Sequence, residues 1–160
     1  MIENGEFTIR SYEYYMRYAL KEAEKAYQKD EVPIGAVIVK NDKIIAKAHN
    51  LREKSQDAIA HAEVLAIRKA CKKLHSWRLS GCDLYVTLEP CAMCAGAIIQ
   101  SRIGQLIIGT MDPKAGAGGS VVNLFGIEQF NHKVDVIQGV LQQECADLLK
   151  RFFRELRQRN

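Results

Sequence analysis

Residues 83–100 read DLYVTLEPCAMCAGAIIQ, and they say more about the architecture than any other segment of the chain. The apolar and β-branched residues at the beginning predict a strand over 83–88, and a short helix is predicted over 91–100. A Cys-x-x-Cys at the start of a helix puts Cys91 and Cys94 on one face of its first turn. The partial positive charge of a helix N-terminus favours thiolates. Together these features indicate half of a metal site.

The segments around this strand–helix unit predict an α/β protein. Apolar residues that recur at spacings of three and four indicate helices over 11–29, 61–74 and 140–157. β-rich runs indicate strands over 32–39, 44–48, 105–109 and 134–137, of which the first two form a hairpin. Residues 51–60 and 110–120 are expected to be loops, the second rich in glycine. We therefore expect a three-layer α/β/α sandwich around a five-stranded mixed sheet, mixed because it opens with an antiparallel hairpin.

Size and composition narrow the class of protein. A chain of 160 residues is long enough for one core, so residues 1–160 are expected to form a single domain. No apolar run approaches the ~20 residues that cross a bilayer, and no signal peptide is visible, so no membrane association is expected. Five cysteines, an odd number at low density, favour a reduced, cytoplasmic protein. The net charge of +4 permits an anionic partner without requiring one.

The missing metal ligand is expected in residues 57–67, DAIAHAEVLAI. His61 is a good zinc ligand, whereas Glu63, two positions later on a predicted helix, points to a different side. The better interpretation gives His61 the metal and leaves Glu63 to face a bound water. Three protein ligands and an open fourth position are typical of catalytic zinc, while structural zinc has a closed set of four.

Each part of this pattern has a simpler explanation when taken alone. The Cys-x-x-Cys could be a redox pair, although the surrounding strand–helix context and Met93 argue against it. His61 could be a capping or core histidine, and Glu63 could merely complement a helix dipole. The combination of His-x-Glu with a later Pro-Cys-x-x-Cys is far more specific, and it is the signature of zinc nucleobase deaminases.

The segments HAEVLAI (61–67) and EPCAMCAGAI (89–98) resemble the cytidine-deaminase-like superfamily. With EVPIGAVIV (31–39) and MDPKAGAGGS (111–120), the chain resembles its bacterial tRNA-specific adenosine deaminase branch over nearly its whole length. The resemblance implies the cytidine-deaminase-like fold and one Zn²⁺ per subunit, held by the histidine and the two cysteines. It also implies that Glu63 is catalytic, and that the reaction is hydrolysis of the wobble adenosine of an arginine tRNA to inosine and ammonia.

Further expectations concern the substrate. By resemblance, Asn50 hydrogen-bonds the flipped base, and the main-chain N–H of Ala62 positions the attacking oxygen. Asn is equally common at a strand-to-loop junction, which is the alternative for Asn50. Pro33 and Ile34 are candidates for an apolar wall beside the base, or else ordinary edge-strand core. Asp112, favoured by the resemblance, and Lys114 are candidates for a substrate edge in the glycine-rich loop, which could instead be a plain turn. 

The C-terminal helix is a candidate RNA contact because it is basic. The basic residues that are candidates for RNA contact are Lys150, Arg151, Arg154 and Arg157. At helical spacing, Lys150, Arg154 and Arg157 make one stripe around Phe152 and Phe153. The alternative is a solvated face over a buried Phe pair. 

The expected partners are the anticodon stem-loop of tRNA and a second copy of the chain in a homodimer, both by resemblance; no protein partner is expected. Rival hypotheses are a cytidine, cytosine or guanine deaminase with the same core, or a non-catalytic zinc-containing RNA-binding subunit. The presence of Glu63 argues against the last, because a purely structural site has no use for that carboxylate. The remaining cysteines, Cys71, Cys82 and Cys145, are expected to be small buried hydrophobes, and Trp77 a packing residue.

Overall fold

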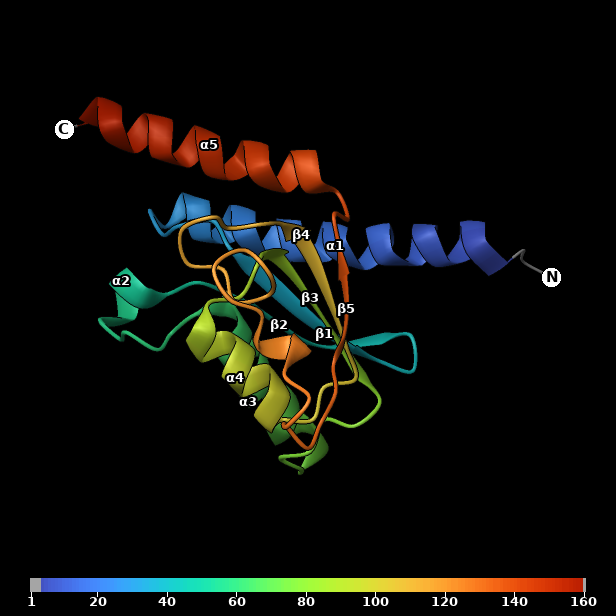
Figure 1. The fold of residues 1–160 in the computed structure, drawn as a ribbon. Helices are drawn as coiled ribbons and strands as arrows, with labels where there is room; N and C mark the ends of the chain where they lie inside the picture. The colour runs from blue at the N-terminus through green and yellow to red at the C-terminus, as the bar shows by residue number, and fades with distance from the viewer. Residues whose placement is uncertain (1–3, 160) are drawn as a thin grey trace.

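The computed structural model describes the backbone of residues 4–159 and the side chains of residues 12–159. A sheet of five strands in the order β2-β1-β3-β4-β5 lies between two helical layers (Figure 1), so the predicted three-layer α/β/α sandwich is confirmed. Helices α1 and α5 cover one face, and α3 and α4 cover the other. The strands are β1 (Gly35–Lys40), β2 (Lys43–His49), β3 (Cys82–Leu88), β4 (Gln105–Thr110) and β5 (Asp135–Gln138). The helices are α1 (Asn4–Gln28), α2 (Arg52–Ser55), α3 (Ala62–Leu74), α4 (Ala92–Gln100) and α5 (Gln142–Arg159), with a 3₁₀ turn over Leu124–Gly126.

The directions of the strands bring the ends of several strands to one edge of the sheet. Strand β1 is antiparallel to both β2 and β3, whereas β3, β4 and β5 are parallel. The start of β1 and the end of β2 therefore lie at the same edge as the carboxyl ends of β3 and β4. Ligands of open α/β sheets bind beyond the carboxyl ends of parallel strands. This edge is accordingly where the fold favours a site.

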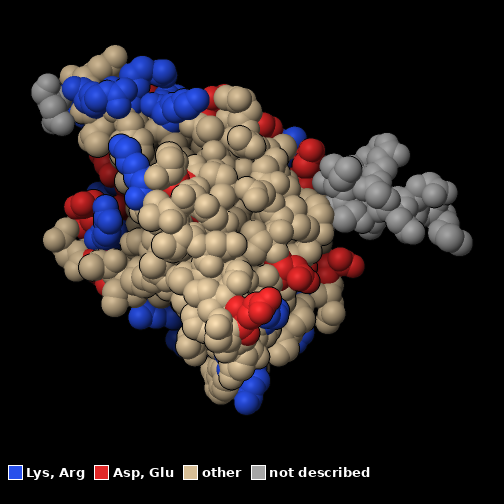
Figure 2. All heavy atoms as spheres, viewed as in Figure 1, with Lys and Arg blue, Asp and Glu red and all other residues tan. Residues whose placement is uncertain are grey.

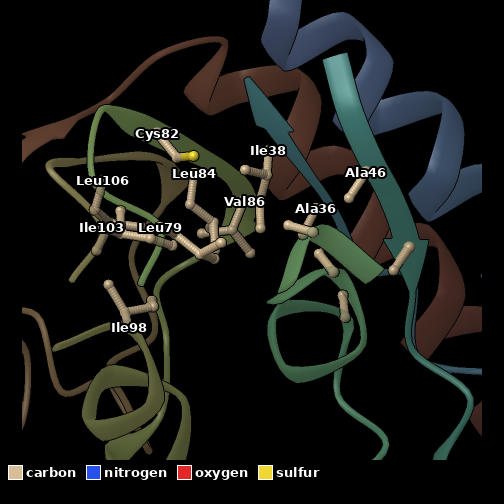
Figure 3. Packing of buried hydrophobic residues seen from close by; sticks show 14 of the residues in the cluster. Ala36, Ile38, Ala46, Leu79, Cys82, Leu84, Val86, Ile98, Ile103 and Leu106 are labelled. Atoms are coloured by element: carbon tan, nitrogen blue, oxygen red, sulfur yellow. The ribbon is translucent and has the colours of Figure 1, made fainter. Parts of the chain in front are cut away.

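Alternating residues of the central strands build two separate cores. Val37, Tyr85 and Ile107 face the α1 and α5 layer, because successive side chains of a strand point to opposite faces. Their neighbours Ile38, Val86 and Ile108 face α3 and α4, in the cluster of which Figure 3 shows a part. Both faces of the sheet are thus covered by apolar contacts, and the site-bearing edge rests on a rigid frame.

Gly35 lets α1 lie directly against the beginning of β1. A Cβ atom built on Gly35 would overlap the carbonyl oxygen of Ala19 and the main-chain nitrogen of Ala23 in α1. Its own N–H donates to the hydroxyl of Thr87, at 3.1 Å. The start of β1 is fixed from two sides, close to the edge described above.

Three local predictions need correction. Residues 51–60 are not entirely loop, because α2 occupies part of the segment and its first N–H groups are capped by side chains from outside it. Cys71 is only half-buried on α3, although Cys82 and Cys145 are buried as expected. Trp77, predicted to be a packing residue, is 54% exposed, and its ring centre lies 4.3 Å from the Arg78 guanidinium carbon.

Element ends also differ from the predicted ones. Helix α1 is already formed at Asn4, before the predicted start at residue 11. Strand β1 begins at Gly35, later than predicted, since Pro33 has no N–H to donate to a ladder. Among residues 4–159, no helix combines the length and the apolar character that crossing a membrane requires.

Candidate metal centre and substrate pocket

Two helix N-termini meet at the sheet edge and bring three potential metal ligands together. His61 is the N-cap residue of α3 and Cys91 that of α4, and neither side chain is used to cap its helix. The Nδ1 atom of His61 lies 3.8 Å from the Sγ atom of Cys91 and 3.5 Å from that of Cys94. The three ligand atoms all lie within 4.8 Å of one another, so they could hold one metal ion.

The spacing fits tetrahedral zinc coordination. Zinc–sulfur and zinc–nitrogen bonds of about 2.3 and 2.0 Å correspond to a ligand–ligand edge of about 3.6 Å in a tetrahedron. The separations of 3.5 and 3.8 Å match that edge. One nitrogen and two sulfurs are also a set that zinc accepts. No fourth His, Cys, Asp or Glu joins the cluster among the described residues.

Electrostatics prepare the three groups for a cation. The pKa of Cys91 lies far below its usual range, because the Cys94 thiol and the His61 ring both hydrogen-bond its sulfur. The Cys91 sulfur in turn raises the pKa of His61 above its ordinary value. The low pKa favours the thiolate form of Cys91, which is the form in which cysteine binds a metal ion.

Glu63 is a buried carboxyl beside this cluster. It is 4% exposed, and it belongs to the wall of the pocket described below. Burial raises its pKa to about 7, and the neighbouring charge of Cys91 acts in the same direction. A carboxyl group that titrates near neutral pH is suited to accept and return a proton during one reaction cycle.

A cavity of about 720 Å³ opens over the cluster at the same sheet edge. Ten of the residues singled out from the sequence line it: Ile34, Asn50, His61, Ala62, Glu63, Cys91, Asp112, Lys114, Lys150 and Arg157. Pro33 and Cys94 are buried behind this surface and do not belong to its lining. The structure thus brings together residues just before β1, just after β2, at the start of α3, at the N-cap of α4, in the glycine-rich loop and on α5.

Nine lining residues were not predicted as pocket residues: Val32, Arg52, Leu88, Glu89, Met111, Pro113, Ala115, Leu149 and Phe153. Leu149 and Phe153 follow the same helical spacing as Lys150 and Arg157, and this periodicity was a usable signal. Arg52 carried no such signal, because the short helix α2 that presents it is capped by distant side chains.

Asn50 links the pocket to the start of α2. Its Nδ2 donates to the carbonyl of Val32 at 3.3 Å, and its Oδ1 accepts from the N–H of Arg52 at 3.1 Å. An amide group has two donor hydrogens and two acceptor lone pairs, so each atom retains one free position. The side chain is held in place by the backbone and can still bind a ligand.

The basic residues of α5 divide between two sides of the helix. Figure 2 shows Lys and Arg gathered over its C-terminal half. Lys150 and Arg157 line the large pocket, together with Phe153. Arg151 instead lies 3.5 Å from Glu24 of α1, with its guanidinium 4.7 Å from the Tyr27 ring centre. Arg154 lies with Arg151 in a smaller hollow, which Lys150 also borders, so of the predicted stripe Arg154 alone does not line the large pocket.

Comparison with known proteins identifies the class to which this fold and site belong. Residues 10–157 match the MafB19-like deaminase family, and the chain belongs to this family. The tRNA-specific adenosine deaminase of Bacillus subtilis (strain 168) is 57% identical over 147 residues, which cover 92% of this chain and 91% of that protein. The tRNA-specific adenosine deaminase of Aquifex aeolicus (strain VF5) is 48% identical over 145 residues, or 91% of this chain and 95% of that protein.

Solved structures show the same relationship. A structure from biochemical and structural studies of A-to-I editing by tRNA:A34 deaminases, at the wobble position of transfer RNA, matches with a TM-score of 0.82 and 47% identity. The match covers 84% of this chain and 98% of the chain in that structure. A guanine deaminase from Nitrosomonas europaea matches with a TM-score of 0.77 but only 27% identity, over 88% of this chain and 83% of that one.

Proposed function

We propose that the protein is a zinc-dependent tRNA adenosine deaminase, which hydrolyses the wobble adenosine of an anticodon loop to inosine and releases ammonia. The observation that carries this proposal is the arrangement of Glu63, a buried carboxyl with a pKa of about 7, beside the His61, Cys91 and Cys94 cluster at the floor of a pocket. Similarity to tRNA-specific adenosine deaminases at 57% and 48% identity supports adenosine in tRNA as the substrate.

His61, Cys91 and Cys94 would hold one zinc ion per subunit. Zinc in such a site supplies hydroxide at neutral pH by lowering the pKa of water to about 7. Glu63 takes the proton that the attacking water loses and transfers it to the ring nitrogen next to the reacting carbon. That protonation makes the carbon more electrophilic. Glu63 then accepts the second proton of the added water, from the hydroxyl on the reacting carbon, and delivers it to the amino group. The carbon–nitrogen bond breaks as the carbonyl forms and ammonia leaves, so one carboxylate serves as base and then as acid.

The upper part of the pocket would receive the flipped base. Asn50, with one donor and one acceptor position free, is placed to hydrogen-bond a purine edge. The N–H of Ala62 would help to orient the attacking oxygen. Ile34 would contribute apolar contact to the ring, with the buried Pro33 supporting it from behind.

An anticodon loop presents splayed bases and a tightly turned phosphate backbone. Lys114 on one side and Lys150 with Arg157 on the other bring positive charge to the pocket, which suits phosphates. Asp112 lines the same pocket and would accept a hydrogen bond from a ribose hydroxyl. Arg154 would contribute at longer range, whereas Arg151 is engaged with Glu24.

A homodimer is part of the proposal. Met93, Val121, Val122 and Phe130 are exposed apolar side chains, and three of them follow the glycine-rich loop while Met93 lies between the two cysteines. Figure 2 shows few charged atoms on the face over α4 and the segment between β4 and β5. Exposed apolar side chains on a face with few charges are typical of protein interfaces. Sedimentation should give a dimer, and Val121→Asp should weaken it. We further propose that residues 1–160 act as one domain and that the protein works in the cytoplasm, where tRNA is used.

The experiment that tests the function compares substrates. The zinc-loaded protein is incubated with an anticodon stem-loop carrying adenosine at the wobble position, with free cytidine and with guanine, and ammonia is measured. Release from the stem-loop alone is expected, together with A-to-G changes at the wobble position when the RNA is sequenced. Release from cytidine or guanine alone would favour the related base deaminases, and no release from any of them would favour a non-catalytic RNA-binding subunit.

A further inference from the structure

Glu89, the residue before Pro90 and Cys91, has a carboxylate whose hydrogen bonds all run to the glycine-rich loop. Its oxygens accept from the main-chain N–H groups of Asp112 at 2.8 Å, Gly118 at 2.8 Å and Ser120 at 3.0 Å, and from the hydroxyl of Ser120. Glu89 is 2% exposed. One buried anion thus gathers backbone groups that are up to eight residues apart in the loop.

The loop is shaped around this carboxylate. A Cβ atom built on Gly116 would overlap the Glu89 carboxyl group, so a side chain at that position would displace the carboxylate from its hydrogen bonds. Two main-chain hydrogen bonds also join the loop to this segment. The N–H of Ala117 donates to the carbonyl of Pro90 at 2.8 Å, and the N–H of Glu89 donates to the carbonyl of Thr110 at 2.9 Å. The loop therefore has the Glu89–Pro90 segment as its scaffold.

The charge of Glu89 is matched by backbone dipoles. Three main-chain N–H groups and the hydroxyl of Ser120 donate to its two oxygens. No Lys, Arg or His forms an ion pair with it among the described residues. A buried carboxylate that accepts several N–H bonds is stable only while those groups converge on it. The carboxylate and the loop conformation consequently require each other.

The glycine-rich loop that Glu89 holds forms one wall of the substrate pocket. Asp112, Lys114 and Ala115 line the cavity, and Asp112 Oδ1 accepts from the N–H of Lys114 at 3.0 Å. The position of the turn over residues 112–115 therefore depends on the hydrogen bond that the Asp112 N–H donates to Glu89. Glu89 itself also lines the pocket, directly next to the Cys91 ligand in sequence.

We propose that Glu89 is a positioning residue for substrate binding, which fixes the loop carrying Asp112 and Lys114 against the metal-binding segment. The proposal rests on the proposed RNA substrate. Glu89 acts through the loop and takes no part in the proton transfers at Glu63. Its loss should weaken binding of the RNA more than it slows the chemical step.

The test uses Glu89→Gln in the full-length, zinc-loaded protein. The amide keeps the size of the side chain but presents an NH₂ group to N–H donors, so at least one of the loop's bonds is replaced by a clash of donors. We expect KM for the anticodon stem-loop to rise by about tenfold or more, as the loss of a charge-assisted hydrogen bond implies. The kcat should change less, and the zinc-to-protein ratio should stay the same. Amide hydrogen exchange should accelerate over residues 112–120.

Two further variants and a control make the outcome decisive. Ser120→Ala, which removes one of the four hydrogen bonds, should cause a smaller change of the same kind if Glu89→Gln folds poorly. Gly116→Ala should reproduce the Glu89→Gln effect, and the double variant should be much less than additive, because both act on one contact. Glu128→Gln makes the same chemical change at an exposed residue and should leave KM and exchange unaltered.

Glu89→Gln with unchanged KM and unchanged exchange over the loop would overturn the proposal. So would a parallel loss of zinc and activity, since Glu89 would then support the metal ligands and not the loop. If the unmutated protein fails to deaminate the stem-loop, the proposed function is wrong. The exchange experiment then still reports whether Glu89 holds the loop.

Discussion

The Nδ1 atom of His49 lies 3.0 Å from the Oε1 atom of Glu22, which ties the end of β2 to α1 directly behind Asn50. Glu22 is 4% exposed, and its second oxygen accepts from Lys25 at 2.6 Å. Burial alone would raise the pKa of Glu22, but the bonds from His49 and Lys25 outweigh it and leave the pKa lowered. The pair therefore contributes stability only while the carboxyl is ionised.

A pH-dependent stability follows from this pair. Because the pKa of Glu22 is lower in the folded than in the unfolded protein, its contribution is present above the ordinary glutamate value of about 4.3 and is lost as the pH falls through the lower folded value. Glu22→Gln should cost about 1.5–3 kcal/mol at pH 7, the range for hydrogen bonds to a charged group. Urea unfolding of both proteins at pH 7 and pH 3 measures this. The difference should shrink at pH 3, and an equal difference at both values would contradict the assignment.

Glu63→Gln should abolish turnover without loss of metal. Removing a positioned acid–base group costs about 10²- to 10⁴-fold in rate. Because the buried carboxyl of Glu63 has its pKa raised by burial, the neutral amide should leave the melting temperature unchanged or higher. Ammonia release from the stem-loop, metal analysis and a thermal melt check the three parts. Near-normal turnover in this variant would show that another group moves the protons.

The ligands themselves should behave differently from Glu63. His61→Ala and Cys91→Ala should lose both metal and activity, because two ligands do not complete a zinc site. A chelator that strips metal from the unmutated protein should lower its melting temperature, and added Zn²⁺ should restore it, since metal binds only the folded arrangement. The half-buried Cys71→Ser serves as the matched cysteine control and should retain metal.

The cations of α5 should separate into two groups. Lys150 and Arg157 line the pocket, so Lys150→Ala and Arg157→Ala should each reduce the slope of log K against log salt for the stem-loop by about 0.7–0.9. Arg151 is engaged with Glu24, so Arg151→Ala should leave the slope nearly unchanged and cost at most about 1 kcal/mol in stability. A slope change confined to Arg151→Ala would reverse this division. 

Much of the architecture was predictable from local patterns. The alternation of Ile38 and Val39, and the three-and-four spacing through Met16, Ala19 and Ala23, give the strands and helices their buried faces. The His61, Cys91 and Cys94 cluster was predictable because both ligand segments begin helices after extended chain. Its convergence depends on the same N-terminal geometry in α3 and α4.

The parts that were missed depend on long-range contacts. Helix α2 is stabilised by the buried carboxylate of Glu31, which accepts from the N–H groups of Glu53 and Lys54 more than twenty residues away. The division of the α5 cations depends on Glu24 of α1, which no pattern within 140–157 reveals. Glu89 looked like an incidental neighbour of the cysteines, because its partners lie in a loop that follows the next strand.

Helix α3 precedes β3 in the sequence and helix α4 follows it. This order has a consequence for the assembly of the metal site. His61 and Cys91 are thirty positions apart, and they meet only after β3 has docked between β1 and β4. A nascent chain that has not yet completed the central sheet therefore has no cation-binding geometry to offer. A metal ion would therefore bind after the sheet has assembled, and we expect metal uptake to follow folding and not to nucleate it.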